Sequence, residues 1–370
     1  MVSLDKSKND TSLALDLLRA VAAQMVCVGH AINFSKCGHT LAPVWGVLIF
    51  FILSGFVIAY TLDSKSRGEN YNLVEFGVER FARIYSVYAP ALLLIAVADW
   101  AVAGLFNYKA LLGNLLMLQN VPNSGFTTYG TAGQLTSIAV EFHIYFFVGA
   151  AFFLLQGKQR ALCVAVLILF TKMPLAYTMN ITETDRSLFV LWLAGFALYF
   201  VLRSADLRGL APWLLLATAA AAYRGNHFFQ PNPYDLANYP IIIMVFTCFL
   251  AATQSTHVLA RFRHVIRFFA GYSLSLFLIH LTIITHITKA WPERYDIALA
   301  AVVVSNIIAA LLASVTERHY RTLASQVKML AHPARSDGAP SGDSGSGPRR
   351  LGNKIVSRIS GDKNPARRDR

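Results

Sequence analysis

The stretch LALDLLRAVAAQMVCVGHAIN, residues 13–33, is apolar over the length that a helix needs to cross a membrane. Arg19 and His30 interrupt it. They are eleven positions apart, about three helical turns, so both side chains project from one face, roughly 16 Å apart along the axis. Ionisable groups are costly in lipid and mark a functional site by default. The alternative is that Arg19 reaches to the near membrane surface while His30 makes a polar contact between helices.

Similar apolar windows recur along the chain. Of its 370 residues, 55% are hydrophobic and only 14% are charged, which indicates a polytopic membrane protein and excludes a soluble domain around one apolar core. We predict an all-α fold with about ten transmembrane helices. The windows lie near residues 13–33, 43–62, 85–105, 136–155, 161–178, 187–202, 209–223, 239–256, 265–286 and 296–315. The apolar segment from Ala110 to Leu118 is too short to cross, so we predict a re-entrant or interfacial helix there.

Basic residues predict the orientation. With a cytoplasmic N-terminus, thirteen loop Lys and Arg lie inside and six lie outside, and twelve more follow Val315. The positive-inside rule therefore predicts that both termini are cytoplasmic. We expect a cytoplasmic segment over 1–12, a transmembrane domain over 13–325 and a basic, disordered cytoplasmic tail over 326–370, which carries much of the net charge of +13. Because no folded basic module accompanies the tail, we do not expect nucleic-acid binding.

Five groups of residues carry the functional information. The first, LDLLRAVAAQMVCVGH, covers residues 15–30. The others are FFILSGFVI (50–58), ERFARIYSVY (79–88), TSIAVEFHIYFF (136–147), and SLFLIH (275–280), which VTERHYRTL follows at 315–323. Each group alone has an ordinary structural explanation. The SGF sequence could be a patch of small residues where helices pack, and the paired arginines could be the positive charge that is common in cytoplasmic loops.

In this order, the five groups resemble the acyltransferase-3 family of integral-membrane acyl-CoA-dependent O-acyltransferases. The first group matches the family's signature of an arginine, ten residues and a histidine, and the third matches its paired-arginine element. Seven residues fall on motif positions: Arg19, His30, Arg80, Arg83, Glu141, Tyr145 and His280. One departure is that Thr136 and Ile138 stand where the family usually has Trp and Leu.

The predicted topology places these residues at defined depths in the membrane. His30 lies near the outer end of the first span, Glu141 one to two turns from the outer end of the fourth, and His280 in the outer half of the ninth. We therefore expect the three titratable groups to converge at similar depth. Arg80 and Arg83 are expected at the opposite, cytoplasmic mouth.

This two-ended arrangement suits a donor and an acceptor that arrive from opposite sides. The resemblance implies acyl-CoA, expected as acetyl-CoA, as the donor co-substrate. Its phosphates would bind Arg80 and Arg83 through charge-assisted bonds, and its pantetheine arm would pass Arg19 on the way to His30. The alternative is that the two arginines only set the topology.

His30 has a suitable intrinsic pKa, about 6.5, to accept a proton from an attacking hydroxyl. Glu141 is expected to orient its imidazole, and an acyl-imidazole intermediate on His30 stays open. His280 and Tyr145 are candidate donors to the oxyanion or the acceptor, or else interhelical hydrogen bonds. Ser54 is expected to serve helix packing because no base is paired with it in sequence.

We therefore predict an O-acyltransferase of the bacterial inner (cytoplasmic) membrane, expected as an O-acetyltransferase. The resemblance implies a carbohydrate or glycolipid acceptor, such as a surface polysaccharide, an O-antigen or a nodulation-factor oligosaccharide, with membrane lipid as the other partner. The competing hypothesis is a transporter or flippase for a polar lipid or sugar. Because Cys37 and His39 in one short loop make a poor metal site, we expect no metal and no permanently bound cofactor.

Overall fold

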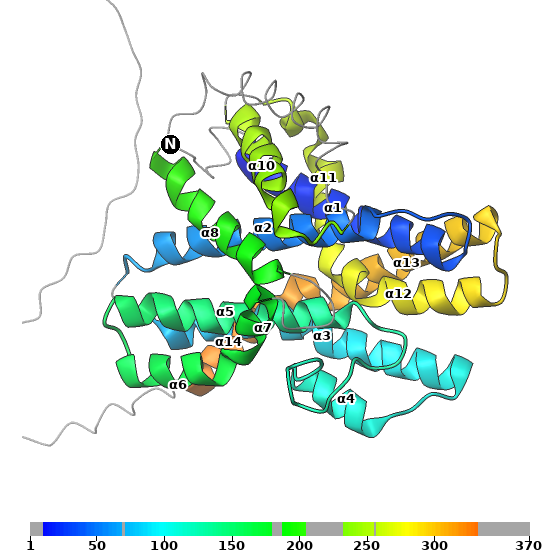
Figure 1. The fold of residues 1–370 in the computed structure, drawn as a ribbon, viewed down its shortest axis with the longest axis horizontal. Coiled ribbons are helices and arrows are strands. Elements are labelled where there is room, and N and C mark those ends of the chain that lie inside the picture. Colours follow the sequence, from blue (N-terminus) through cyan, green and yellow to red (C-terminus); the bar gives the residue numbers. More distant parts are fainter. Residues whose placement is uncertain (1–9, 69–70, 180–186, 205–231, 255–256, 332–370) are drawn as a thin grey trace, which may run out of the picture. The chain divides into compact units, whose positions relative to one another are not determined.

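The computed structural model describes residues 10–68, 71–179, 187–204, 232–254 and 257–331, and every regular element in these ranges is a helix (Figure 1). The α-helices are α1 (Thr11–Phe34), α2 (Ala42–Lys65), α3 (Leu73–Ala103), α4 (Tyr108–Leu115), α5 (Leu135–Leu155), α6 (Arg160–Phe170), α7 (Lys172–Met179), α8 (Leu188–Ser204), α10 (Tyr239–Thr253), α11 (Arg263–Ala270), α12 (Ser273–Lys289), α13 (Tyr295–Val315) and α14 (Tyr320–Ala331). Short 3-10 helices lie at η1 (Leu236–Asn238), η2 (Leu259–Phe262) and η3 (Glu317–His319). The all-α prediction is confirmed.

The described ranges contain six helices that are long and apolar enough to cross a membrane, or up to eight spans if two bent helix pairs each count as one. The pairs are α6 with α7, bent by 55°, and the η2–α11 segment with α12, bent by 48°. Helix α8 is apolar but shorter, and the predicted span at 209–223 lies outside the described residues. The polytopic prediction is confirmed with this smaller count, and the cytoplasmic placement of the termini stays a prediction.

Helix α3 begins twelve residues before the predicted third span. Its start is set by Asn72, whose side-chain oxygen accepts a hydrogen bond from the backbone N–H of Glu75 at 3.1 Å. Charged residues in the first turns exclude this part from an apolar window, although it is helical. Arg80 and Arg83 consequently lie two to three turns inside a 31-residue helix.

Helix α4 is the short helix that was predicted in the loop after the third span. It has only eight residues, and Asn107 caps its start by accepting a hydrogen bond from Ala110 N at 3.0 Å. The loop that follows α4 is anchored on Asp99 of α3, a completely buried carboxylate. Asp99 accepts hydrogen bonds from Thr131 N at 2.9 Å and from His286 Nε2 of α12 at 2.8 Å. These bonds hold the end of α3 against α12.

Helices α2 and α8 cross with their backbones in close contact. A Cβ atom added at Gly55 would lie 2.0 Å from the carbonyl oxygen of Trp192, and one added at Gly195 would lie 2.1 Å from that of Ile52. Only glycine permits this approach, as is common where membrane helices pack closely. The crossing brings Trp192 against the centre of α2.

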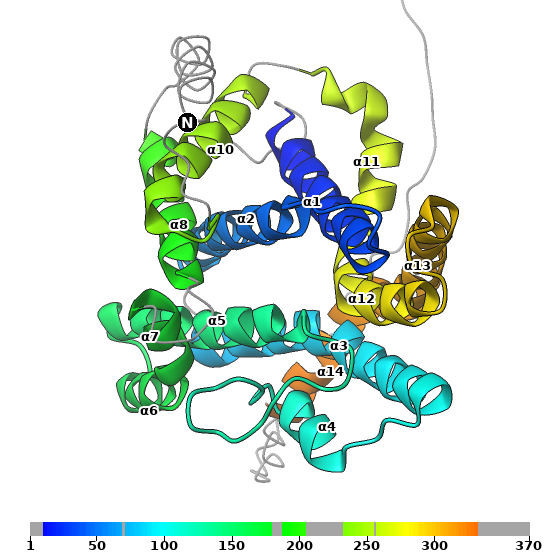
Figure 2. The same ribbon diagram turned by 45° about the vertical axis from the view of Figure 1, so that its right-hand side comes forward.

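Helices α1, α12 and α13 pack against one another on another side of α2 (Figure 2). A polar network joins all three. Asn306 Oδ1 accepts hydrogen bonds from Gln24 Nε2 at 2.6 Å and from the Tyr272 hydroxyl at 2.8 Å. Such interhelical bonds contribute to packing inside a membrane. They fix α1, with Arg19 and His30, relative to α12, with His280.

Helix α14 continues to Ala331, beyond the predicted start of the tail at residue 326. Residues 332–370, which make up most of that predicted tail, lie outside the described residues.

Candidate active site

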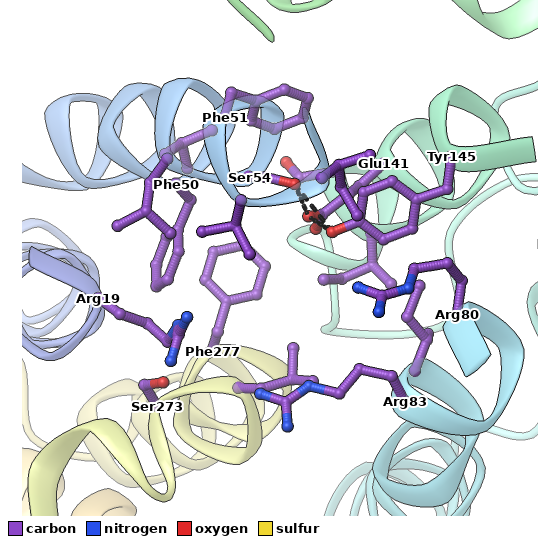
Figure 3. Close-up of a pocket in the computed structure, with 18 residues that line it drawn as sticks. Arg19, Phe50, Phe51, Ser54, Arg80, Arg83, Glu141, Tyr145, Ser273 and Phe277 are labelled. Carbon is purple, nitrogen blue, oxygen red and sulfur yellow. Dashed lines mark hydrogen bonds between the residues drawn. The ribbon is translucent and has the colours of Figure 1, made fainter. Parts of the chain in front are cut away.

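A cavity of about 130 Å³ lies among α1, α2, α3, α5 and α12 (Figure 3). Its apolar lining is Val47, Phe50, Phe51, Leu53, Val57, Ile58, Ile84, Ile138, Leu274 and Phe277. Its polar lining is Arg19, Ser54, Arg80, Arg83, Ser137, Glu141, Tyr145 and Ser273. Five of the seven residues predicted for the site therefore face one space, and the two that do not are His30 and His280.

Three guanidinium groups point into this cavity, from α1 and from two successive turns of α3 (Figure 3). Arg19 Nη1 lies 3.1 Å from Asp16, and Arg83 Nη2 lies 3.7 Å from Glu317. Arg80 Nε is buried and has no hydrogen-bond partner among the described residues. The lining contains three cations and one carboxylate, and Arg80 is the lining arginine without an ion-pair partner among the described residues, so an anion would bind most favourably beside Arg80.

Glu141 is held by hydroxyl groups. Its Oε1 accepts a hydrogen bond from Ser54 Oγ at 2.6 Å and a second one from the Tyr145 hydroxyl. The Trp192 indole N–H donates to Ser54 Oγ at 3.2 Å. Glu141 also lies within electrostatic range of Arg19 and Arg80. The carboxylate therefore has a fixed position inside the cationic cavity.

Ser54 has a polar partner in addition to the helix packing that was expected of it. Its hydroxyl bonds a carboxylate that is 87 positions away in the chain. Trp192 was not predicted at all. The one sequence feature that points to Trp192 is that Ser54 precedes Gly55. At Gly55, helix α8 comes close enough to α2 for the Trp192 indole to reach Ser54.

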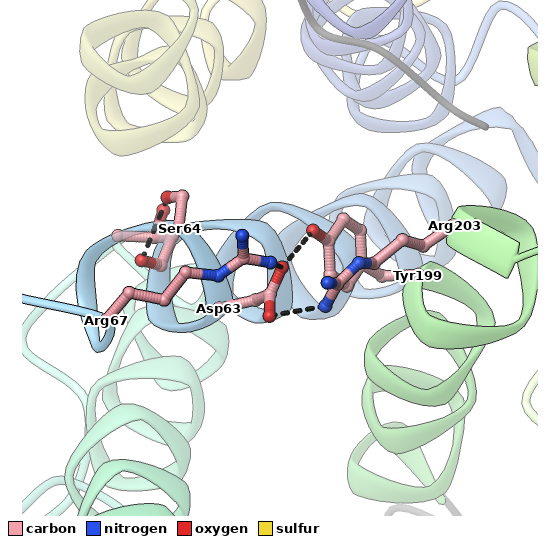
Figure 4. Close-up of polar contacts among 6 residues, drawn as sticks. Asp63, Ser64, Arg67, Tyr199 and Arg203 are labelled. Carbon is pink, nitrogen blue, oxygen red and sulfur yellow. Dashed lines mark hydrogen bonds and ion pairs between the residues drawn. The ribbon is translucent and has the colours of Figure 1, made fainter.

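A second polar cluster fixes the other end of the α2–α8 contact (Figure 4). Asp63 of α2 accepts hydrogen bonds from the Tyr199 hydroxyl at 2.7 Å and from Arg203 Nη1 at 2.5 Å, and Arg67 Nη2 lies 3.4 Å away. Tyr199 and Arg203 belong to α8, so the cluster ties the two helices together. It supports the helix that carries Trp192.

His30 and His280 form a pair of their own. His30 Nδ1 lies 2.8 Å from His280 Nε2, and the two rings are nearly parallel. His280 Nδ1 lies 3.0 Å from the carbonyl oxygen of Leu276 and 2.9 Å from that of Phe277. Because carbonyls only accept, His280 carries its proton on Nδ1 and accepts at Nε2. His30 must then donate from Nδ1, which leaves a lone pair on its Nε2.

Phe277 lies between the two groups of polar residues. Its side chain lines the cavity, its ring centre is 5.5 Å from that of Phe50 in an edge-to-face contact, and it is 6.1 Å from that of His280. Phe277 therefore lies between the cavity and His280, and Phe50 packs against it; we call these two rings the aromatic layer.

The expected convergence of His30, Glu141 and His280 is only partly present. His30 contacts His280, whereas Glu141 is bonded to Ser54 and Tyr145. The reason lies in the helix packing, because α1 packs on α2 and α12 while α5 packs on α3 and α6. The arginines expected at a distant mouth share the cavity with Glu141 instead.

Glu317, in the 3-10 helix after α13, holds Arg83 in place. Its carboxylate lies 3.7 Å from Arg83 Nη2 and accepts a hydrogen bond from Ser275 Oγ at 3.1 Å. Burial raises the pKa of the Glu317 carboxyl above its usual value, while the positive charge of Arg83 acts in the opposite direction. A buried carboxylate beside a cavity arginine is therefore part of the site's charge balance.

The helical spans, the arginine-lined cavity and the histidine pair define a polytopic membrane protein with a polar cavity among its helices. Comparison with known families gives the class of reaction. The model of the acyltransferase-3 family, described as an acyltransferase domain, matches residues 12–316. The chain belongs to this family and is a membrane acyltransferase. No curated protein and no solved structure matches the chain.

Proposed function

We propose that the protein transfers an acyl group, expected to be acetyl, from cytoplasmic acyl-CoA to a hydroxyl of a carbohydrate or glycolipid. The observation that carries this proposal is the convergence of three guanidiniums on one cavity among membrane-spanning helices. Such a site selects a ligand with several negative charges, and coenzyme A carries phosphates at the end remote from its thioester. The proposed location is the bacterial inner membrane.

In this proposal, Arg19, Arg80 and Arg83 hold the phosphates of the donor. Arg80 has the strongest physical case, because its buried Nε has no hydrogen-bond partner among the described residues. A buried donor without an acceptor costs free energy, which an incoming phosphate oxygen would recover. Glu141 balances the arginines before the donor arrives, and the Tyr145 hydroxyl holds Glu141 by a hydrogen bond, which places Tyr145 at the phosphate end of the donor.

His30 is the proposed general base. Its Nε2 accepts the proton of the acceptor hydroxyl while the oxygen forms a bond with the thioester carbonyl carbon. The carbon–sulfur bond then breaks, and the departing CoA thiolate takes the proton back from the imidazolium. His280 fixes the His30 tautomer and shares the positive charge, the part that the sequence had suggested for Glu141. Transfer through an acyl-imidazole on Nε2 is the alternative route.

Family membership favours this enzyme over the transporter that intramembrane charges alone would also allow. The first experiment compares O-acetyl groups on surface glycans of cells with and without the protein. The second measures initial transfer rates of purified variants with labelled acetyl-CoA and the glycan that the first identifies. His30→Ala should lower the rate by about 10² to 10⁴ while leaving CoA affinity unchanged.

Arg80→Ala should instead raise KM for acetyl-CoA, and the increase should be smaller with a dephospho-CoA thioester. Arg160→Ala is the matched control, since Arg160 is exposed and outside the cavity. A His30→Ala protein that acetylates at the wild-type rate would overturn the catalytic assignment. CoA binding that does not depend on Arg80 or Arg83 would overturn the donor site.

A further inference from the structure

Two of the three cavity arginines are held by neighbours on their own helices. Arg19 Nη1 lies 3.1 Å from Asp16, three residues earlier in α1. Arg80 Cζ lies 5.7 Å from the ring centre of Phe76, four residues earlier in α3. Residues three or four positions apart are neighbours on a helix surface. The places of these two guanidiniums therefore depend on helices that already line the cavity.

Arg83 is held from a distant part of the chain. Its Cζ lies 4.9 Å from the ring centre of Tyr320, the first residue of α14, and its Nη2 lies 3.7 Å from Glu317 in η3. These two partners are three positions apart, and side chains at this spacing lie above one another in a 3-10 turn. One short turn therefore presents a ring and a carboxylate to the same guanidinium.

The Tyr320 ring is the partner that leaves the charge of Arg83 available. The face of an aromatic ring attracts a cation but carries no net charge, so a phosphate would still meet the full charge of the guanidinium. The Glu317 carboxylate neutralises part of that charge, and it is also bonded to Ser275. Arg83 lines the cavity, whereas Tyr320 and Glu317 do not. Both partners therefore contact Arg83 from outside the space that a ligand would fill.

The position of the Tyr320 ring depends on how α14 docks. Helix α14 packs against α3, the helix that carries Arg83 (Figure 2). Ala324, one turn after Tyr320, is buried, as expected for the face of α14 that packs on the protein. Both η3 and α14 follow residue 316, where the match to the family ends. The groups that hold Arg83 thus come from a segment outside the matched domain.

We propose that Tyr320 is a positioning residue for the acyl donor, because its ring holds the Arg83 guanidinium toward the cavity before a donor phosphate arrives. An arginine side chain has several rotatable bonds, and fixing it in advance removes part of the entropy cost of binding. Donor affinity then depends on the docking of α14, and by linkage a bound donor stabilises that docking. This inference rests on the proposed function, which assigns a donor phosphate to Arg83.

The test is the dissociation constant of acetyl-CoA for the purified full-length protein, measured by titration calorimetry, together with the transfer rate at saturating acetyl-CoA. Tyr320→Leu should weaken acetyl-CoA binding about fivefold and leave the saturated rate unchanged. Tyr320→Phe keeps the ring and should restore the wild-type affinity. In an Arg83→Ala background, Tyr320→Leu should have no further effect on binding. Gln326→Ala, an exposed position of α14, is the matched control.

Hydrogen–deuterium exchange of α14 gives a second measurement that a merely structural role would not change. Acetyl-CoA should slow amide exchange in α14 of the wild type, and this effect should be smaller in Tyr320→Leu. Faster exchange in α14 when acetyl-CoA binds would overturn the proposal.

The binding data also separate this inference from the proposed function. If Arg83→Ala weakens acetyl-CoA binding but Tyr320→Leu does not, the donor site stands and the positioning role of Tyr320 is refuted. An effect of Tyr320→Leu that persists in the Arg83→Ala background would refute it as well. If the wild type binds no acetyl-CoA, or if Arg83→Ala binds it as tightly as the wild type, the proposed donor site fails and this inference fails with it.

Discussion

Gly55→Ala tests whether the close contact between α2 and α8 holds the Ser54 hydroxyl in place. The new Cβ would lie 2.0 Å from the carbonyl oxygen of Trp192 and 2.9 Å from the backbone nitrogen of Phe196. Both are backbone atoms, so neither can rotate away. Non-bonded heavy atoms pack best near 3.5–4.0 Å, so the helices must separate locally by roughly 1 Å or more. Such overpacking costs about 1–3 kcal/mol.

The same displacement reaches the cavity. The Trp192 indole N–H donates to Ser54 Oγ at 3.2 Å, and an added 1 Å would take this contact beyond hydrogen-bond distance. Ser54 in turn donates to Glu141. We therefore expect Gly55→Ala to lower both the free energy of unfolding and the rate of acyl transfer.

The assay is an SDS-titration unfolding curve of the purified protein together with initial transfer rates. Gly133→Ala is the matched control, because the nearest atom to its new Cβ is 3.9 Å away. Trp192→Phe should reproduce the effect on rate without the clash. Wild-type stability in the Gly55→Ala protein would refute the proposed contact, and wild-type activity despite lower stability would show that the indole bond does not matter to transfer.

Three further predictions concern the charged groups. His280→Ala should lower the transfer rate in the wild-type background but have little further effect in a His30→Ala background, because His280 acts through His30. A double-mutant cycle measures this, and effects of the two substitutions that simply multiply would contradict the coupling between the histidines. Glu141→Gln removes the one carboxylate that lines the cationic cavity, so KM for acetyl-CoA should fall, and a raised KM would count against donor binding there. Burial raises the pKa of Glu317 in the folded protein above its unfolded value of about 4.5. The contribution of Glu317 to the free energy of unfolding is therefore fully present at low pH and is lost as the pH rises through the folded pKa. Glu317→Gln should flatten this decline of the free energy of unfolding with pH.

The approximate position of most helices could be predicted because apolar windows reflect the thickness of the bilayer, whereas the predicted number of spans exceeds the six to eight in the described residues. Helix α1 runs from Thr11 to Phe34, close to the predicted 13–33. The prediction fails where a helix extends beyond its apolar part. Arg80 and Arg83 belong to such an extension, so a window search places them outside the span although they lie inside α3.

The composition of the site could be predicted in part, but its pairing could not. Helical periodicity puts Arg19 and His30 on one face of α1, yet it does not say which neighbouring helix each side chain meets. The partner of His30 is 250 positions away on α12, and Ser54, one of the two hydroxyl partners of Glu141, comes from α2. These pairings follow from how the helices cross, which includes the glycine contact at Gly55.

The aromatic layer of Phe50 and Phe277 bears on the electrical insulation of the membrane. A cavity with three guanidiniums invites small anions as well as the donor, and each charge that crosses a membrane at 100 mV dissipates about 2.3 kcal/mol of stored energy. Apolar constrictions oppose this leak because a hydrated ion cannot shed its water there. An acyl group carries no charge and no tightly held water. In the proposed mechanism, the two rings therefore let the acyl group reach His30 while the membrane keeps its potential.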